Sequence, residues 1–172
     1  MPLPAELRTA RVWPKGRFVE DFEPGQEIEH HWGRTLTEAD NTAFVAATLS
    51  YHPRFLNADY VDRVHDGVQH AHPMLVFCTV LGLTVEDLSE KGGAFLGVDD
   101  LVFHRPVSLG ETLQVRSEVL DVRGSRSRPD HGIVRWRSTG YVVTTSEQQP
   151  VISYERANLI PRRTTAEVSA DA

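Results

Sequence analysis

The sequence predicts an α+β fold in which a long antiparallel sheet wraps around one buried helix. Between Met74 and Leu88, apolar residues recur at i, i+3, i+4 spacing on one face, and further apolar residues fill the other face. This pattern is typical of a helix that is buried on all sides. After Gly92 the apolar period changes to strict alternation, which indicates half-buried strands. Helices followed by a run of strands, without a repeating β-α order, favour α+β.

The segment before the central helix predicts a strand and a first helix. The strand covers residues 26–36. Thr37 then begins a helix, because its side chain can accept a hydrogen bond from a backbone N–H and the acids that follow favour the positive helix end. Pro53 ends this helix, since proline lacks the N–H that a helix interior needs.

A short helix over residues 59–64 ends at Gly67, and Pro73 occupies the first turn of the central helix. Gly82 indicates either a close backbone approach or a break in that helix. The remaining chain predicts four strands, at residues 94–103, 113–119, 134–137 and 151–158, joined by turns such as 106–110 and 124–132.

The composition indicates one globular domain. The chain has 172 residues, of which 40% are hydrophobic and 24% charged, which is an ordinary globular balance. We expect the domain to span residues 17–161, with an irregular lead-in at 1–16 and a flexible tail at 162–172. The net charge is −6 and no Lys/Arg block occurs. We therefore expect no nucleic-acid partner and no anionic membrane partner.

A single cysteine, Cys78, excludes an internal disulfide and fits a reducing cytoplasm. Because it lies in an apolar run, we expect Cys78 in the core. We expect a cytoplasmic location, since no apolar stretch approaches a membrane span and no signal peptide is visible. The pair His30-His31 does not predict a metal site, because neighbouring strand residues point to opposite faces. We expect no metal ion and no cofactor.

Two short segments contain the polar side chains that are best suited to take part in catalysis. Residues 49–57 read Leu-Ser-Tyr-His-Pro-Arg-Phe-Leu-Asn, and residues 70–75 read His-Ala-His-Pro-Met-Leu at the mouth of the central helix. Polar side chains there would lie at the edge of the core, where an active site places its acid, base and carbonyl-binding donor.

These segments, together with five others in the family's order, resemble the MaoC-like dehydratase family. The similarity covers residues 17–160, and Arg-Pro-Asp at 128–130 is most similar to the mesaconyl-CoA hydratase-like branch. The resemblance implies a hotdog fold, a homodimer or larger homo-oligomer, and an acyl thioester of coenzyme A or an acyl carrier protein as ligand. The matching pieces lie at residues 18–25, 34–40, 71–75, 103–107, 110–113 and 127–132.

The chain departs from this family where the chemistry is expected. The resemblance implies an acid or amide and a histidine five residues apart, and a backbone N–H from a glycine that follows a histidine. Aligning on Pro53 puts Ser50 and Phe55 at the paired positions, whereas aligning on Leu56 puts His52 and Asn57 there. The glycine position holds Pro73, which has no N–H to donate.

A rebuilt catalytic site would use His52, whose imidazole titrates near neutral pH, as the main acid or base. Asn57 could orient water, or simply cap the next helix. His72 could face the thioester, or satisfy a neighbouring carbonyl at the core edge. His70 is interpreted as a surface residue.

Tyr51 and Arg54 are candidates for binding the carboxylate of an acidic acyl group, because arginine can donate two parallel hydrogen bonds to one carboxylate. Pro73 is expected beside the substrate. Arg128, with Arg126, could hold a phosphate of the carrier, or lie in a solvated turn where Arg128 pairs with Asp130.

Three functions follow from these residues. The first is a hydratase or dehydratase, a lyase that acts on an α,β-unsaturated or 3-hydroxyacyl thioester through a non-standard site. The second is a hotdog thioesterase, for which Asp59 or Asp62 would be the nearest carboxylate. The third is a catalytically silent subunit that binds an acyl thioester.

Overall fold

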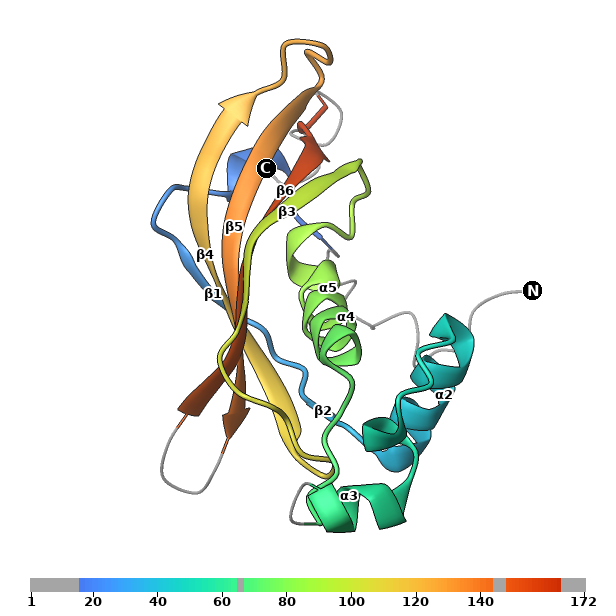
Figure 1. Ribbon diagram of the computed structural model, residues 1–172. Coiled ribbons are helices and arrows are strands. Elements are labelled where there is room, and N and C mark those ends of the chain that lie inside the picture. The colour runs from blue at the N-terminus through green and yellow to red at the C-terminus, as the bar shows by residue number, and fades with distance from the viewer. Residues whose placement is uncertain (1–15, 65–66, 144–147, 165–172) are drawn as a thin grey trace, which may run out of the picture.

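The computed structural model describes residues 16–64, 67–143 and 148–164. It confirms the α+β fold: one antiparallel sheet curves around a central helix (Figure 1). The strand order is β1-β4-β5-β6-β3, and β2 also pairs with β4. The strands are β1 (Glu27–Glu29), β2 (Arg34–Thr35), β3 (Phe95–Phe103), β4 (Thr112–Gly124), β5 (His131–Val143) and β6 (Gln148–Pro161).

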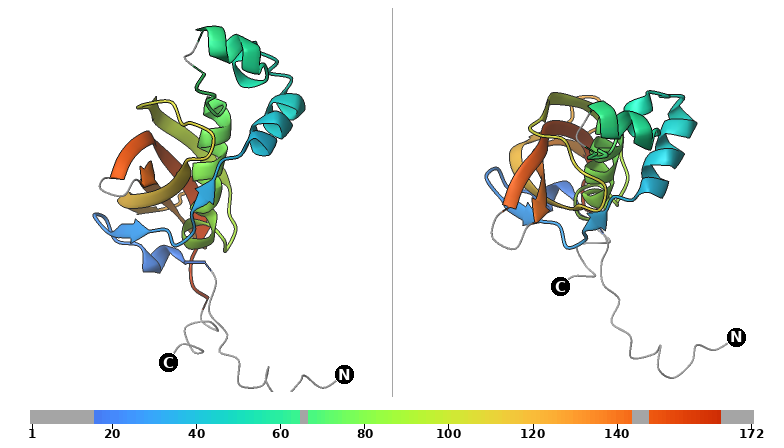
Figure 2. Two further views of the ribbon diagram at one scale, coloured as in Figure 1. Left: turned by 90° about the horizontal axis from the view of Figure 1, so that it is seen from below. Right: turned by 60° about the horizontal axis from the view of Figure 1, so that its bottom comes forward.

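The helical elements precede β3 in the chain. Helix α4 lies along the concave face of the sheet and α5 continues it, whereas α2 and α3 project beyond the N-terminal end of α4 (Figures 1 and 2). The elements are the 3₁₀ turns η1 (Val19–Asp21) and η2 (Pro53–Phe55), and the helices α2 (Glu38–Thr48), α3 (Ala58–Val64), α4 (Pro73–Leu83) and α5 (Val85–Leu88).

Helix α4 approaches the sheet most closely at Gly140 of β5. A Cβ atom at Gly140 would lie 2.7 Å from a methyl of Val80 and 2.8 Å from a methyl of Ile152. Val80 and Ile152 are both fully buried. Because Gly140 has no side chain, α4 can pack closely against the concave face of the sheet.

The predicted helix from Met74 to Leu88 is interrupted at Thr84, which separates α4 from α5. Of the two alternatives for Gly82, the structure shows a break close by and no close approach, since a Cβ there would meet nothing within 4 Å. The prediction that this helix is buried on all sides is wrong, because Met74 is 41% exposed and Cys78 is exposed. The assignment of Cys78 to the core is wrong because α4 turns only one face to its own sheet.

The predicted strand over residues 26–36 is also wrong as a single element. It forms two short strands, β1 and β2, both paired with β4. Between them His30 turns inward to Asp87 of α5, and Trp32 donates to Glu86 at 3.0 Å. These side-chain bonds to α5 draw the chain away from regular pairing.

Helix α2 begins as predicted, with Thr37 accepting from the N–H of Asp40 while the Asp40 carboxylate accepts from the N–H of Thr37. It ends at Leu49, in a left-handed conformation with φ of 57°, so Pro53 does not end α2 but begins η2. The short helix after it is confirmed as α3.

The predicted lead-in at 1–16 and tail at 162–172 lie almost wholly outside the described residues. Within the described ranges, no helix combines the length and apolar character that crossing a membrane requires.

Candidate active site

The fold brings the two polar segments together at the N-terminal end of α4. The ring of Phe55, in the first segment, lies 4.7 Å from the imidazole of His72 in the second, measured between ring centroids. Phe44 of α2 contacts the other side of His72 at 5.1 Å. The two motifs therefore form one wall, as the sequence predicts.

A cavity of about 300 Å³ opens beside this wall. A volume of this size suits a small acyl group. Arg54 and Pro73, both predicted to contact substrate, line it. Its other lining residues are Phe55, His70, Ala71, Val76, Phe103, His104, Arg105, Pro106 and Val107.

The pocket contains groups that the sequence alone did not assign. His70, interpreted as a surface residue, is half-buried and lines the cavity, as do His104 and Arg105. His104 contacts Ser153 of β6 through Nε2 at 2.8 Å. The segment 103–107 carried the family resemblance, and this was the one available signal that His104 and Arg105 might lie at a site.

Arg105 is neutralised by a carboxylate. Its guanidinium donates to both carboxylate oxygens of Glu111, at 3.1 and 3.0 Å. Burial would raise the pKa of Glu111, but the hydrogen bonds from Arg105 and from the N–H of Ser108 hold it below its ordinary value. Arg54, in contrast, makes no ion pair within the part of the chain that the structure describes; its guanidinium carbon lies 5.4 Å from the centre of the Phe55 ring.

His52 and His72 both act as helix caps. The Nδ1 of His52 accepts from the N–H of Arg54 at 3.2 Å, and the Nδ1 of His72 accepts from the N–H of Met74 at 3.1 Å. Because each Nδ1 accepts, the ring proton of the neutral imidazole resides on Nε2. Burial lowers the pKa of His72, which favours this neutral form. In the neutral form, each ring therefore presents Nε2–H as a hydrogen-bond donor.

The first turn of α4 offers no backbone donor to a ligand. Pro73 has no N–H, the N–H of Met74 is bound by His72, and the N–H groups of Leu75 and Val76 donate to the carbonyl of His72 at 2.9 and 3.1 Å. A thioester oxygen at this helix end would have to be bound by a side chain.

Four predicted residues of the two polar segments are not among the lining residues of the cavity: His52, His72, Asn57 and Tyr51. His72 lies directly between two lining residues in the chain, and His52 lies two residues before one. Asn57 accepts from the N–H of Tyr60 at 3.0 Å, so the capping alternative is the one that the structure shows, and a catalytic role for Asn57 stays a prediction. Tyr51 is 63% exposed and is not among the lining residues.

Arg126 and Arg128 lie in the turn between β4 and β5, at the end of the sheet opposite the pocket (Figure 1). The 13 residues of β4 span roughly 40 Å at about 3.3 Å per residue. Neither arginine can contact a small ligand in the pocket of its own chain. The predicted partner of Arg128, Asp130, instead pairs with His131 at 3.0 Å.

The histidine pair at 30–31 behaves as the strand argument predicts. His30 is buried and His31 exposed. His30 contacts Asp87 through Nδ1 at 2.7 Å and Ser117 through Nε2 at 2.9 Å. Burial lowers the pKa of His30 despite the opposing effect of Asp87. Among the described residues, no group of three His, Cys, Asp or Glu side chains could hold a metal ion.

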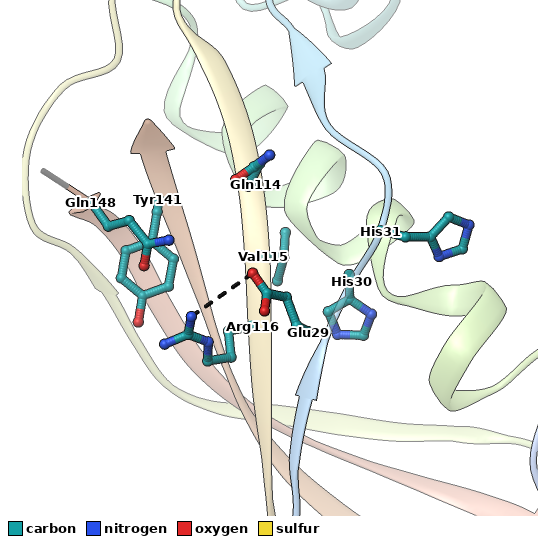
Figure 3. Close-up of a pocket in the computed structure, with 8 residues that line it drawn as sticks. All are labelled: Glu29, His30, His31, Gln114, Val115, Arg116, Tyr141 and Gln148. Atoms are coloured by element: carbon teal, nitrogen blue, oxygen red, sulfur yellow. Dashed lines mark ion pairs between the residues drawn. The ribbon is translucent and has the colours of Figure 1, made fainter. Parts of the chain in front are cut away.

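A second hollow, drawn in Figure 3, lies beside β1, β4, β5 and the start of β6. Its lining includes Glu29 and Arg116, which form an ion pair at 3.9 Å. None of the predicted site residues lies in it. The pocket at the end of α4 is therefore the candidate active site.

A curved sheet around a central helix, with a pocket at the N-terminal end of that helix, defines a hotdog-fold protein. A Mycobacterium tuberculosis protein described as a double hotdog fold superposes with a TM-score of 0.78 over 87% of this chain and 46% of its own, at 24% identity. The family model for mesaconyl-CoA hydratase matches residues 4–172. The chain belongs to this family of MaoC-like proteins.

The relatives in this family are longer. Mesaconyl-CoA hydratase from Haloarcula marismortui is 42% identical over 166 residues, which cover 96% of this chain and 46% of the relative. Beta-methylmalyl-CoA dehydratase from Chloroflexus aurantiacus is 32% identical, covering 86% and 41% respectively. The structure of a MaoC domain protein dehydratase from the same organism superposes with a TM-score of 0.80 at 29% identity, covering 91% and 43%. The chain thus spans less than half the length of these relatives.

Proposed function

We propose that this chain hydrates an α,β-unsaturated acyl thioester, or dehydrates the matching 3-hydroxyacyl thioester, carried on coenzyme A or an acyl carrier protein. The observation that carries the proposal is the pocket at the N-terminal end of α4, where both polar segments meet. Relatives named as hydratases and dehydratases support it.

Hydration needs a base that takes a proton from water while the water oxygen bonds to the β carbon, a donor that holds the enolate oxygen, and an acid that protonates the α carbon. We assign the donor to Nε2–H of His72, because the backbone of α4 offers none. His52, whose Nδ1 accepts from the N–H of Arg54, is assigned to hydrogen-bond the substrate through Nε2–H. The acid is the imidazolium that forms when the base takes its proton from water, and it passes that proton to the α carbon. The base would come from His70 or His104, which line the pocket.

We further propose that the acyl group carries a second carboxylate. Arg54 lines the pocket and makes no ion pair with any carboxylate in the described ranges, whereas the charge of Arg105 is balanced by Glu111. Mesaconyl and β-methylmalyl groups, which name two of the relatives, each contain a free carboxylate. An arginine fork pairs with such a group at two points.

The proposed assembly is a homodimer of hotdog units. Among the strands of the described residues, β3 pairs only with β6, which leaves an open sheet edge there. Five of its apolar side chains are exposed: Phe95, Leu96, Leu101, Val102 and Phe103. An open sheet edge with exposed apolar residues is typical of a surface that another protein unit covers. The length of the relatives and the double hotdog neighbour support a second hotdog unit there. We also propose a cytoplasmic location, which the single cysteine fits.

A silent, thioester-binding subunit is the second candidate function. Two observations favour it: neither alignment of the loop puts a histidine at the position expected to hold the catalytic one, and both His52 and His72 use Nδ1 for capping. The thioesterase alternative gains no such support, since Asp59 and Asp62 are exposed on α3 and do not line the pocket.

The test is a mass-spectrometric assay with the purified protein and a panel of enoyl-, 3-hydroxyacyl- and dicarboxylic acyl-CoA thioesters. Gain or loss of one water with the thioester intact supports the lyase. Release of free coenzyme A would instead indicate a thioesterase, and binding without any turnover a silent subunit.

The carboxylate assignment is tested by Arg54→Met, with Arg63→Met on the exposed face of α3 as the matched control. Loss of a charge-assisted pair worth about 1.5–3 kcal/mol should raise KM for mesaconyl-CoA roughly 10- to 150-fold. Crotonyl-CoA, which lacks the second carboxylate, should be affected much less. Equal losses for both substrates would contradict the assignment.

A further inference from the structure

Asn41 is the one fully buried side chain of α2 that is polar. It is 0% exposed, and Val45 is the only other buried residue of this helix. The rest of α2 is exposed or half-buried. A buried amide must satisfy its own hydrogen bonds, so its partners show what it holds.

Both ends of the Asn41 amide bind backbone, and each end binds a different motif. The Nδ2 group donates to the carbonyl of Phe55 in η2 at 3.1 Å. The Oδ1 atom accepts from the N–H of His72, the capping residue of α4, at 2.8 Å. One side chain on α2 therefore joins the two polar segments to each other.

The joined residues belong to two segments that both line the pocket. Arg54 and Phe55 of η2 line one part, and Ala71 and Pro73, on either side of His72, line another. The carbonyl of Phe55 also accepts from the side-chain amide of Gln69 at 2.8 Å, so a second side chain holds η2 near the segment that leads into α4. Asn41 differs from Gln69 in bonding directly to the backbone of both η2 and the capping residue of α4, and it therefore contributes to the spacing between Arg54 and His72.

We propose that Asn41 is a positioning residue that fixes the spacing between the carboxylate-binding Arg54 and the carbonyl-binding His72. The proposal rests on the function proposed above, because it assigns Asn41 to the same pocket. Its physical consequence is that a change at Asn41 misplaces two groups at once, while neither group itself is altered. A displacement of about 1 Å in a catalytic site can reduce turnover about 100-fold.

The first variant is Asn41→Asp, which keeps the size and the acceptor for the His72 N–H but replaces the donor to Phe55 by an oxygen. We expect kcat/KM for a dicarboxylic thioester to fall roughly 10- to 100-fold at about pH 8. A buried carboxyl has a raised pKa, and its protonated form can donate again. The ratio of variant to wild-type kcat/KM should therefore recover about tenfold or more from about pH 8 to about pH 6.

The matched control is Gln149→Glu, an amide-to-acid change at an exposed position of β6. Its ratio to the wild type should stay near one at both pH values. An Asn41→Asp enzyme with unchanged kcat/KM, or with a loss that does not recover at low pH, would overturn the proposal.

A second measurement does not require catalysis. Hydrogen exchange followed by mass spectrometry should show faster exchange in the segments 49–57 and 70–75 of Asn41→Asp, with peptides from β4 and β5 unchanged. If the wild type turns over no thioester, the proposed function fails. This measurement would still test whether Asn41 positions the two segments. Unchanged exchange in both segments would overturn it, and exchange that rises throughout the protein would also do so, since that would indicate general unfolding.

Discussion

The close contact between α4 and β5 gives a prediction whose size follows from the structure. The change Gly140→Ala places a methyl 2.7 Å from Val80 and 2.8 Å from Ile152, well inside ordinary contact distance. Overpacking of this kind costs about 1–3 kcal/mol. In a domain of this size, a loss of about 2 kcal/mol lowers Tm by roughly 4–8 °C.

The change Val80→Ala removes two methyl groups from a fully buried side chain. The transfer free energy of about 0.8 kcal/mol for each, plus the cost of the cavity, gives a loss of about 2–3 kcal/mol. This change also vacates the space that the new methyl at position 140 would enter. The double variant should therefore lose less stability than the sum of the single losses, by roughly 1 kcal/mol.

The relief should be partial, because Ile152 still opposes the new methyl. The assay is urea unfolding of the wild type, both single variants and the double variant at one protein concentration, since oligomers link stability to concentration. Additive losses within about 0.3 kcal/mol would refute the reasoning that Gly140 exists to admit α4.

Three further predictions concern charge, exposure and capping. Because the folded-state pKa of His30 lies below its unfolded value near 6.5, its contribution to stability is fully present above that pH and is lost as the pH falls towards the folded pKa. In His30→Gln, the free energy of unfolding measured with urea should fall less steeply as the pH is lowered. An unchanged dependence on pH would argue against His30 as its source. The lowered pKa of His72 acts in the same direction, so part of the dependence should remain. Cys78 should react readily with a thiol reagent in the native protein because it is exposed on α4, whereas slow reaction would contradict the exposed α4 face. Thr37→Ala should cost about 1 kcal/mol in the unfolding assay through loss of the α2 cap, and Thr37→Ser should restore most of it.

Local patterns were sufficient for most of the elements. The alternating residues after Gly92 give strands β3 to β6, and the cap at Thr37 and the proline at 73 begin α2 and α4 as predicted. These signals are encoded by residues close together in the chain, so they can be recognised before the fold is known. The strand predicted over 26–36 failed for the opposite reason: its interruption depends on bonds from His30 and Trp32 to α5, more than fifty residues away.

The candidate site, too, could be predicted only in part from the sequence. The sequence by itself determined that two polar segments flank the entrance of the central helix, and that Pro73 cannot supply a backbone donor. Only the tertiary structure decided that His70 and His104 line the pocket, and that Arg128 lies at the opposite end of the sheet. It also decided that Arg105 pairs with Glu111 while Arg54 pairs with no carboxylate of the described residues. The apolar pattern of α4 likewise could not show which side contacts its own sheet. Burial, charge pairing and pocket lining depend on contacts between distant segments, and those contacts exist only once the sheet has curved around α4.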